Sequence, residues 1–169
     1  MNQEINNQKL SKQEEIALLL QDAETECKHL RDKTECVFDL CDYIYTTQEA
    51  ISELGLDDEL IHQLVEDYVE QVLKTKQLFS YYITELDNAR ENHKPLDFIP
   101  LRELAHKNLG VARNLRIKDG QSILEKMMHE ENIDCLRYYL KALEVCAIKL
   151  KPEVAYNTIK LIKIKSTIF

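Results

Sequence analysis

The stretch DELIHQLVEDYVEQVLKTKQLFSYYITEL, residues 58–86, decides the fold class of this protein. Its apolar residues return every three or four positions, which is the spacing that places side chains on one face of an α-helix. The residues of this stripe are Ile61, Leu64, Val65, Tyr68, Val69, Val72, Phe79, Tyr82, Ile83 and Leu86. The stretch therefore predicts a long amphipathic helix.

Helical spacing continues on both sides of this stretch. Residues 12–45 carry apolar or small residues at helical intervals and predict one long N-terminal helix or a broken pair. Gly55 ends that pattern, and Asp57 and Asp58 supply an N-cap and an acidic first turn for the helix that follows. Residues 12–45, before the long helix, are therefore expected to be helical as well.

The second half of the chain shows the same pattern with clear breaks. The prolines of ENHKPLDFIP, residues 91–100, end the long helix. Further helices are expected over 100–116, 123–128 and 133–150, with a bend at residues 118–120. Pro152 suits the first turn of a final helix, although the alternating end of that segment also fits a strand.

Composition supports an all-α domain and excludes several classes of function. The chain has 169 residues with only 3 Gly and 3 Pro, so turn-forming residues are scarce. Its net charge of -8 argues against nucleic acid as the main partner. No apolar run approaches the roughly 18 residues that a membrane-spanning helix needs, and no leader is evident. We expect a cytoplasmic protein whose five cysteines are reduced thiols.

Charge is distributed unevenly along the chain. Residues 101–169 hold 13 Lys and Arg against 8 Asp and Glu, whereas residues 1–100 hold 9 against 22. The second half therefore carries a charge of +5 and the first half -13. His106 lies in the basic half, on the helix expected from residue 100 to 116.

His106 is expected to face solvent. Its direction on a helical projection lies roughly 160° from the apolar stripe of its own helix. Gly110 lies one turn later on the same outward face, with Arg102 one turn earlier and Arg113 two turns later. A mid-helix glycine costs about 1 kcal/mol relative to alanine, so we interpret Gly110 as room for another molecule to approach. Leu109, on the flank of this face, is expected to be able to meet a partner.

These residues suit phosphoryl chemistry. A neutral imidazole can act as a nucleophile toward phosphorus, and guanidinium groups can neutralise phosphoryl oxygens through charge-assisted hydrogen bonds. An exposed histidine on a charged helix is usually only a solvated surface residue, and it is the surrounding Gly and Arg residues that favour a functional reading of His106. The sequence shows no Gly-rich phosphate loop and no Ser-His-Asp order, so a free-standing enzyme is not expected.

The stretch AHKNLGVARNL, residues 105–115, resembles the phosphorylation motif of histidine-containing phosphotransfer (HPt) domains. His106, Gly110, Ala112 and Leu115 match the His, Gly, small and Leu positions of that motif. The residues before it, ELGLDDELIHQLVEDYVEQVLKTKQLF, resemble the long second helix of the family. The resemblance covers roughly residues 50–150.

The resemblance implies an antiparallel four-helix bundle with an extra long N-terminal helix and a C-terminal helix. The corresponding divisions are an N-terminal helical extension over 1–49, the HPt-like bundle over 50–150, and a Lys-rich helix packed on the bundle over 151–169. It further implies a phosphocarrier that relays a phosphoryl group on His106 to or from a response-regulator receiver domain, or from a sensor histidine kinase. The Mg²⁺ ion would belong to the receiver, so no metal or cofactor is expected in this chain.

Two positions depart from the family pattern. The lysine that usually lies three residues after the histidine, and that stabilises the phosphoryl group in the family, is Leu109 here. Arg113, Arg102 and Lys107 offer compensating positive charge, with Arg113 the preferred substitute. Arg116 stands where many members have glycine, which indicates a different ending of the helix.

Three other functions remain open from the sequence. The first is a degenerate HPt-like adaptor that docks on a kinase or receiver without transfer. The second is a metal or redox sensor, whose candidate residues are Cys27, His29, Cys36 and Cys41. Their irregular spacing favours packing in the core instead. The third is a structural module whose N-terminal helix forms a homodimer through its apolar stripe, which is compatible with phosphotransfer.

Overall fold

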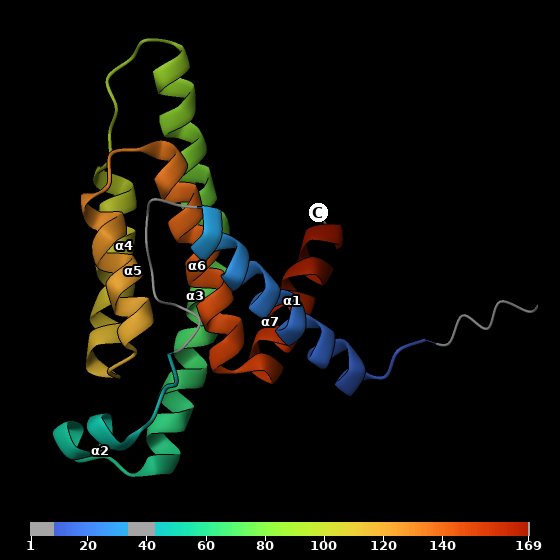
Figure 1. Ribbon diagram of the computed structural model, residues 1–169. Helices are drawn as coiled ribbons and strands as arrows, with labels where there is room; N and C mark the ends of the chain where they lie inside the picture. Colours follow the sequence, from blue (N-terminus) through green and yellow to red (C-terminus); the bar gives the residue numbers. More distant parts are fainter. Residues whose placement is uncertain (1–8, 34–42, 169) are drawn as a thin grey trace, which may run out of the picture.

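The computed structural model describes residues 9–33 and 43–168 of the chain. Within these ranges the protein is all-α, with helices packed antiparallel and without strands, as the sequence predicts (Figure 1). The helices are α1 (Lys12–Lys33), α2 (Gln48–Leu54), α3 (Asp58–Glu91), α4 (Ile99–Asn114), α5 (Lys118–His129), α6 (Ile133–Leu150) and α7 (Pro152–Ile168).

Helices α3, α4, α5 and α6, here called the central bundle, enclose most of the apolar core. Each packs on the next along the chain, and α6 returns to pack on α3. The long helix α3 begins where its sequence predicts, because the side chain of Asp57 accepts a hydrogen bond of 2.8 Å from the backbone N–H of Leu60. Its apolar stripe is buried, with Ile61, Val65 and Phe79 fully enclosed.

The bend expected at residues 118–120 is instead the first turn of α5. Gly120 lies inside this helix, and the side chain of Tyr68 from α3 packs against it. A Cβ atom added to Gly120 would clash with the hydroxyl oxygen of Tyr68. The glycine therefore leaves room for the Tyr68 side chain, and it does not mark a turn.

The expected N-terminal helix over 12–45 is wrong at its end. Helix α1 spans Lys12–Lys33 of the described residues, and residues 43–46 are not helical. Residues 34–42, including Cys36 and Cys41, lie outside the described residues. Tyr43 and Tyr45 point to the end of α4, whereas Ile44 between them is 82% exposed, an alternation typical of extended chain. The short helix α2 was not predicted.

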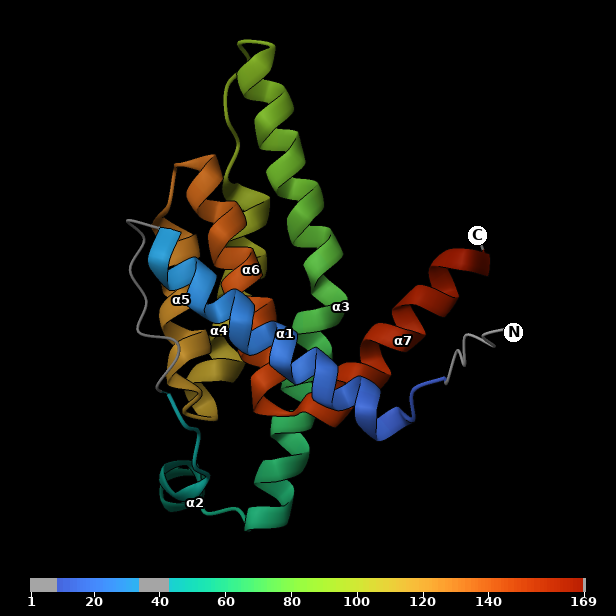
Figure 2. The ribbon, with the colours of Figure 1, turned by 45° about the vertical axis from the view of Figure 1, so that its right-hand side comes forward.

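Helix α1 packs on α6 of the same chain (Figure 2). Its apolar stripe supplies Ile16, Ala23, Cys27 and Leu30, which are buried. The sequence suggested that this apolar stripe forms a homodimer. In the structure the stripe packs against α6 of the same chain. Dimerisation itself stays a prediction.

The final segment is helical throughout its described length, from Pro152 to Ile168. Its first turns pack against α3 and α6, with Ala155 and Thr158 buried. Its later turns leave the bundle, and Leu161 and Ile164 are about half exposed (Figure 2). Over the described residues no helix has both the length and the apolar character needed to cross a bilayer.

Candidate functional site

His106 lies on α4 with its side chain exposed, as the sequence predicts. Helix α4 begins with Pro100 in its first turn and buries Leu101, Ala105 and Ala112. These buried positions orient the helix so that residue 106 faces outward. Among the described residues, no hydrogen bond or ion pair to the imidazole of His106 is found. Both ring nitrogens are therefore available to solvent or to a partner.

Gly110 lies one turn after His106 and is also exposed. A Cβ atom added there would meet no atom within 4 Å. The glycine is therefore not required by packing within the chain, in contrast to Gly120. Its absence of a side chain leaves the backbone beside His106 open to an approaching molecule.

Arg113 is engaged in an ion pair at the edge of this face. Its guanidinium donates a hydrogen bond of 2.9 Å to Oε1 of Glu125 on α5. The pairing, together with a hydrogen bond from Gln121, lowers the pKa of the Glu125 carboxyl. Because both side chains are substantially exposed, the pair contributes little to stability and can rearrange at low cost.

Arg102 is directed away from the ring of His106. Its guanidinium carbon lies 5.1 Å from the centre of the Phe98 ring, one turn toward the start of α4. It also forms an ion pair of 3.6 Å with Glu131, in the α5–α6 connection. The direction follows from helix geometry, because long side chains lean toward the N-terminus of their own helix.

Lys107 and Glu103 complete the exposed face of α4. Both side chains are exposed, and within the described part of the chain neither forms an ion pair. Lys107 follows His106 directly and contributes positive charge beside the ring. Glu103 lies three positions before His106, which places a carboxylate on the neighbouring turn. Any anion bound at His106 would be attracted by Lys107 and repelled by Glu103.

Leu109 does not lie on the exposed flank that the sequence suggested. It is only 2% exposed and belongs to the continuous apolar core. Helix α4 packs against both α3 and α5, so its buried arc is wider than a single apolar stripe. Asn108, 1% exposed, marks the α3 side of this arc through a long hydrogen bond of 3.5 Å to Thr75. Leu109 is therefore not available for docking a partner in this conformation.

Arg116 ends α4 in the left-handed backbone conformation, with φ of 58°. The N–H of Ile117 donates to the carbonyl of Ala112 at 3.0 Å, a closure that usually has glycine at the left-handed position. Arg116 thus adopts the conformation that a glycine would favour, and its guanidinium pairs with Glu53 of α2. The sequence suggested a different helix ending here, yet the backbone is of the glycine type.

Two tyrosines before α2 were missed as structural residues. The hydroxyl of Tyr45 donates to the carbonyl of Leu115 at 2.7 Å, and that of Tyr43 donates to the carbonyl of Arg116 at 3.2 Å. They satisfy carbonyl groups that the end of α4 leaves without helical partners. Burial raises the pKa of Tyr45 to about 12. Their alternate spacing across Ile44 is the only sequence signal that could have indicated this extended segment.

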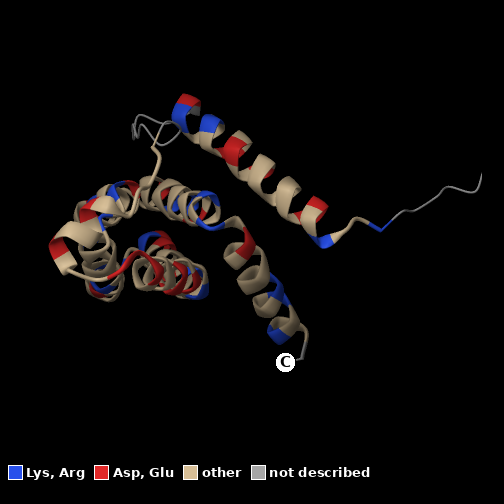
Figure 3. Cartoon of the chain, turned by 90° about the horizontal axis from the view of Figure 1, so that it is seen from below, with Lys and Arg blue, Asp and Glu red and all other residues tan. Residues whose placement is uncertain are grey.

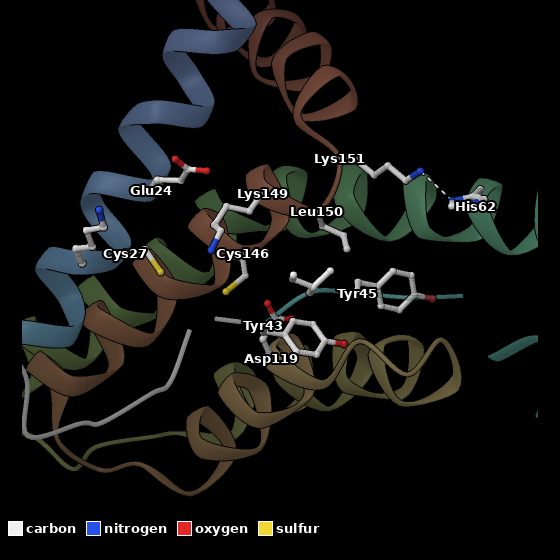
Figure 4. Close-up of a pocket in the computed structure, with 12 residues that line it drawn as sticks. Glu24, Cys27, Tyr43, Tyr45, His62, Asp119, Cys146, Lys149, Leu150 and Lys151 are labelled. Carbon is white, nitrogen blue, oxygen red and sulfur yellow. Dashed lines mark hydrogen bonds between the residues drawn. The ribbon is translucent and has the colours of Figure 1, made fainter. Parts of the chain in front are cut away.

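A cavity of about 490 Å³ lies between α1, the end of α6 and the start of α5 (Figure 4). His106 does not line it. Its walls include Asp119, Cys27 and Cys146, with the amino group of Lys151 lying 3.0 Å from Nδ1 of His62 at one side. Burial raises the pKa of the Asp119 carboxyl and raises that of the Cys146 thiol well above its ordinary value. The thiol is therefore protonated at neutral pH and a poor nucleophile.

The residues proposed for a metal or redox sensor are not assembled in the described structure. Cys27 is buried on α1, whereas His29 on the same helix is exposed. Cys36 and Cys41 lie outside the described residues. Across residues 9–33 and 43–168, no group of three or more His, Cys, Asp or Glu side chains could hold a metal ion.

Comparison of the chain with models of protein families, with curated proteins and with solved structures found no match. The function of this chain must therefore be inferred from its own residues and their geometry.

Proposed function

We propose that this protein is a histidine phosphotransfer protein that carries a phosphoryl group on His106 and exchanges it with a response-regulator receiver domain. One observation carries the proposal. The exposed imidazole of His106 lies one turn from the open backbone at Gly110, on α4, which packs against α3 and α5. The likeness of residues 105–115 to the HPt motif, and the antiparallel packing of α3 to α6, support the same function.

The transfer step requires little machinery from this chain. A ring nitrogen of His106 attacks the phosphorus of the receiver's aspartyl phosphate as the bond between phosphorus and the aspartate oxygen breaks. The reverse step returns the phosphoryl group and regenerates the neutral imidazole. Such a transfer depends on in-line positioning and on neutralising the equatorial oxygens, and the receiver's Mg²⁺ would supply much of that neutralisation. The chain contributes a rigid, accessible nucleophile.

Positive charge beside His106 comes from Lys107 and, on rearrangement, from Arg113. Lys107 is exposed and forms no ion pair with the described residues. Arg113 must leave Glu125, or share it, to reach a phosphoryl group. Such a move would follow the usual direction of helical side chains, which point toward the N-terminus of their own helix and, for Arg113, toward the turns that carry His106. An arriving phosphoryl group, with more charge than one carboxylate, would compete effectively for the guanidinium.

A second function is favoured by a specific observation. Leu109 occupies the motif's lysine position and is buried, and both nearby arginines are paired with glutamates. These features suit an HPt-like adaptor that docks on a receiver or kinase without accepting phosphate. The two functions differ in one measurable property, which is whether His106 becomes phosphorylated.

The deciding experiment is phosphate profiling against a panel of purified, phosphorylated receiver domains. We expect at least one receiver to transfer an acid-labile, base-stable phosphate to this chain, and His106→Gln to abolish the labelling. His29→Gln is the matched control, because His29 is also an exposed histidine on a helix. Undiminished labelling of His106→Gln would refute the assignment. Receiver binding without any labelling would establish the adaptor function in its place.

A further inference from the structure

Helices α1 and α7 lie beside one another at the edge of the molecule (Figure 3). A groove lies between them, lined by residues of both helices. Its volume is about 440 Å³. The α1 wall carries Glu15 and Asp22, and the α7 wall carries Lys160 and Lys163. Leu18, which is 44% exposed, lies on the α1 wall between the two acids. The groove thus has an acidic side, a basic side and an apolar strip.

This face of α1 is distinct from the face that holds the helix in place. The buried positions of α1, such as Ala23 and Cys27, face α6, whereas residues 15, 18 and 22 lie on an adjoining face. The outer turns of α7 likewise expose Leu161 at 53% and Ile164 at 50%. Two neighbouring helices therefore present apolar side chains of which the described chain leaves about half exposed.

The two helices carry opposite charge. Residues 12–26 of α1 contain five acidic residues and one lysine, whereas residues 154–168 of α7 contain three lysines and no acidic residue. Within one copy the starts of the two helices are linked by Lys12 of α1, which lies 3.7 Å from Glu153 of α7, and by Tyr156, which donates to Glu15. Neither contact pairs an acid of α1 with a lysine of α7. Among the described residues no ion pair links Asp22 to α7.

We propose that this groove is the interface of a homodimer, in which the outer turns of α7 of a second copy lie against the α1 wall of the first. A two-fold axis makes the contact reciprocal, so that the contact between a basic α7 and an acidic α1 occurs twice in the dimer. The exposed Leu18 would be covered by Leu161 and Ile164 of the partner copy. A second copy fits because its own acidic α1 and basic α7 complement the two walls of the groove.

The dimer leaves the proposed phosphotransfer site accessible. Helix α4, which carries His106, packs on α3 and α5 and not on α1 or α7. The inference is independent of the chemistry proposed for His106. Failure of one would leave the other intact, since oligomeric state and phosphate labelling are separate measurements.

The test is the molar mass of the full chain in solution, measured by light scattering over a range of protein and salt concentrations. We expect a dimer at low ionic strength that weakens as salt screens the opposite charges. Reversing both lysines in Lys160→Glu with Lys163→Glu should weaken association by about tenfold or more, because repulsion replaces attraction at two symmetric contacts. Lys74→Glu with Lys94→Glu changes the net charge equally on exposed positions elsewhere and should leave the dimer unchanged.

Mixing complementary variants separates an interface from a folding defect. Glu15→Lys with Asp22→Lys should also weaken self-association, whereas its equimolar mixture with the reversed-lysine variant should form a heterodimer. Only contact between copies can restore association in that mixture, because neither chain regains its own charges. A monomeric wild-type protein throughout its soluble range would overturn the proposal. So would a dimer that persists in both reversed variants, since that interface would lie elsewhere.

Discussion

Arg113 on α4 donates a 2.9 Å hydrogen bond to Glu125 on α5, and Gln121 donates to the same carboxylate oxygen at 3.3 Å. The guanidinium proposed to replace the missing lysine is therefore held by a carboxylate of the neighbouring helix. Because each residue of the pair can be substituted alone, the effect of the Arg113 guanidinium can be distinguished from that of the Glu125 carboxylate.

Arg113→Ala and Glu125→Gln should change the rate of phosphoryl transfer in opposite directions. Loss of the guanidinium should slow transfer by about tenfold, the scale of one charge-assisted interaction in a transition state. Glu125→Gln should accelerate it by a few-fold, because it releases the guanidinium. Single-turnover transfer from a phosphorylated receiver measures both rates. Unchanged rates in both variants would exclude Arg113 as the substitute for the missing lysine.

Gly110→Ala should stabilise the protein while slowing transfer. An added Cβ meets no atom within 4 Å, and alanine favours the helix more than glycine does. The free energy of unfolding should therefore rise by about 0.5–1 kcal/mol. The same methyl group would obstruct a receiver that closes over His106. Urea unfolding and transfer kinetics measure the two effects. Asn114→Ala, on the exposed side of the same helix, is the control and should leave the rate unaltered. An unaltered rate in Gly110→Ala would mean that no partner approaches this backbone.

Leu109→Lys should not increase the rate of phosphoryl transfer, although the resemblance to the HPt motif alone suggests that it would. The leucine is 2% exposed, so the substitution removes buried apolar contacts and brings an ammonium group into the core. We expect a loss of about 2–4 kcal/mol, reduced to the extent that the lysine stem reaches solvent. Leu109→Met, which keeps the volume, should cost less than about 1.5 kcal/mol. Equal unfolding midpoints for the lysine variant and the wild type would show that this side chain has an open path outward.

Stability should fall as the pH rises through the titration of Asp119. Burial raises the pKa of this carboxyl above its ordinary value, although the N–H of Gly120 donates to it at 2.6 Å. The folded state therefore holds the proton more tightly than the unfolded state, and deprotonation at higher pH costs stability. Asp119→Asn should be more stable than the wild type at neutral pH, and the difference should vanish below about pH 3.9.

Urea unfolding at a series of pH values tests this expectation. The control is Asp134→Asn, which alters an exposed carboxylate in the first turn of α6. That variant should lose a few tenths of a kcal/mol at neutral pH, because an acidic first-turn residue favours the helix dipole. A wild-type profile parallel to that of Asp119→Asn would mean that the cavity is hydrated enough to solvate the charge.

Helix positions were largely predictable from the sequence, because apolar periodicity is strong and breaks are few. Helices α3 and α6 begin directly after Asp57 and Asn132, and α7 begins at Pro152. The side chains of these three residues have a defined role at helix starts. The bend predicted at Gly120 was wrong because a glycine can either mark a turn or make room for a side chain of another helix. Only the position of Tyr68 distinguishes the two, and it belongs to another part of the chain.

The exposed site was predictable where it depended on one helix alone. The outward direction of His106 and Gly110 follows from the apolar stripe of α4. Leu109 and the pairing of Arg113 depend on α5, which packs beside α4 at an angle that no local pattern specifies. Tyr43 and Tyr45 likewise act on the end of a helix some seventy positions later. Local spacing carries no information on such contacts.

The packing of α1 on α6 has a consequence for the order in which the protein assembles. Helices α3 to α6 contact their neighbours in sequence, and the return of α6 to α3 spans only this part of the chain, so the bundle forms with shorter loop closures than α1 requires. Helix α1 must instead find a partner near the opposite end of the chain, which closes a far longer loop. The bundle with His106 should therefore fold first, and α1 should dock afterwards as a separable step.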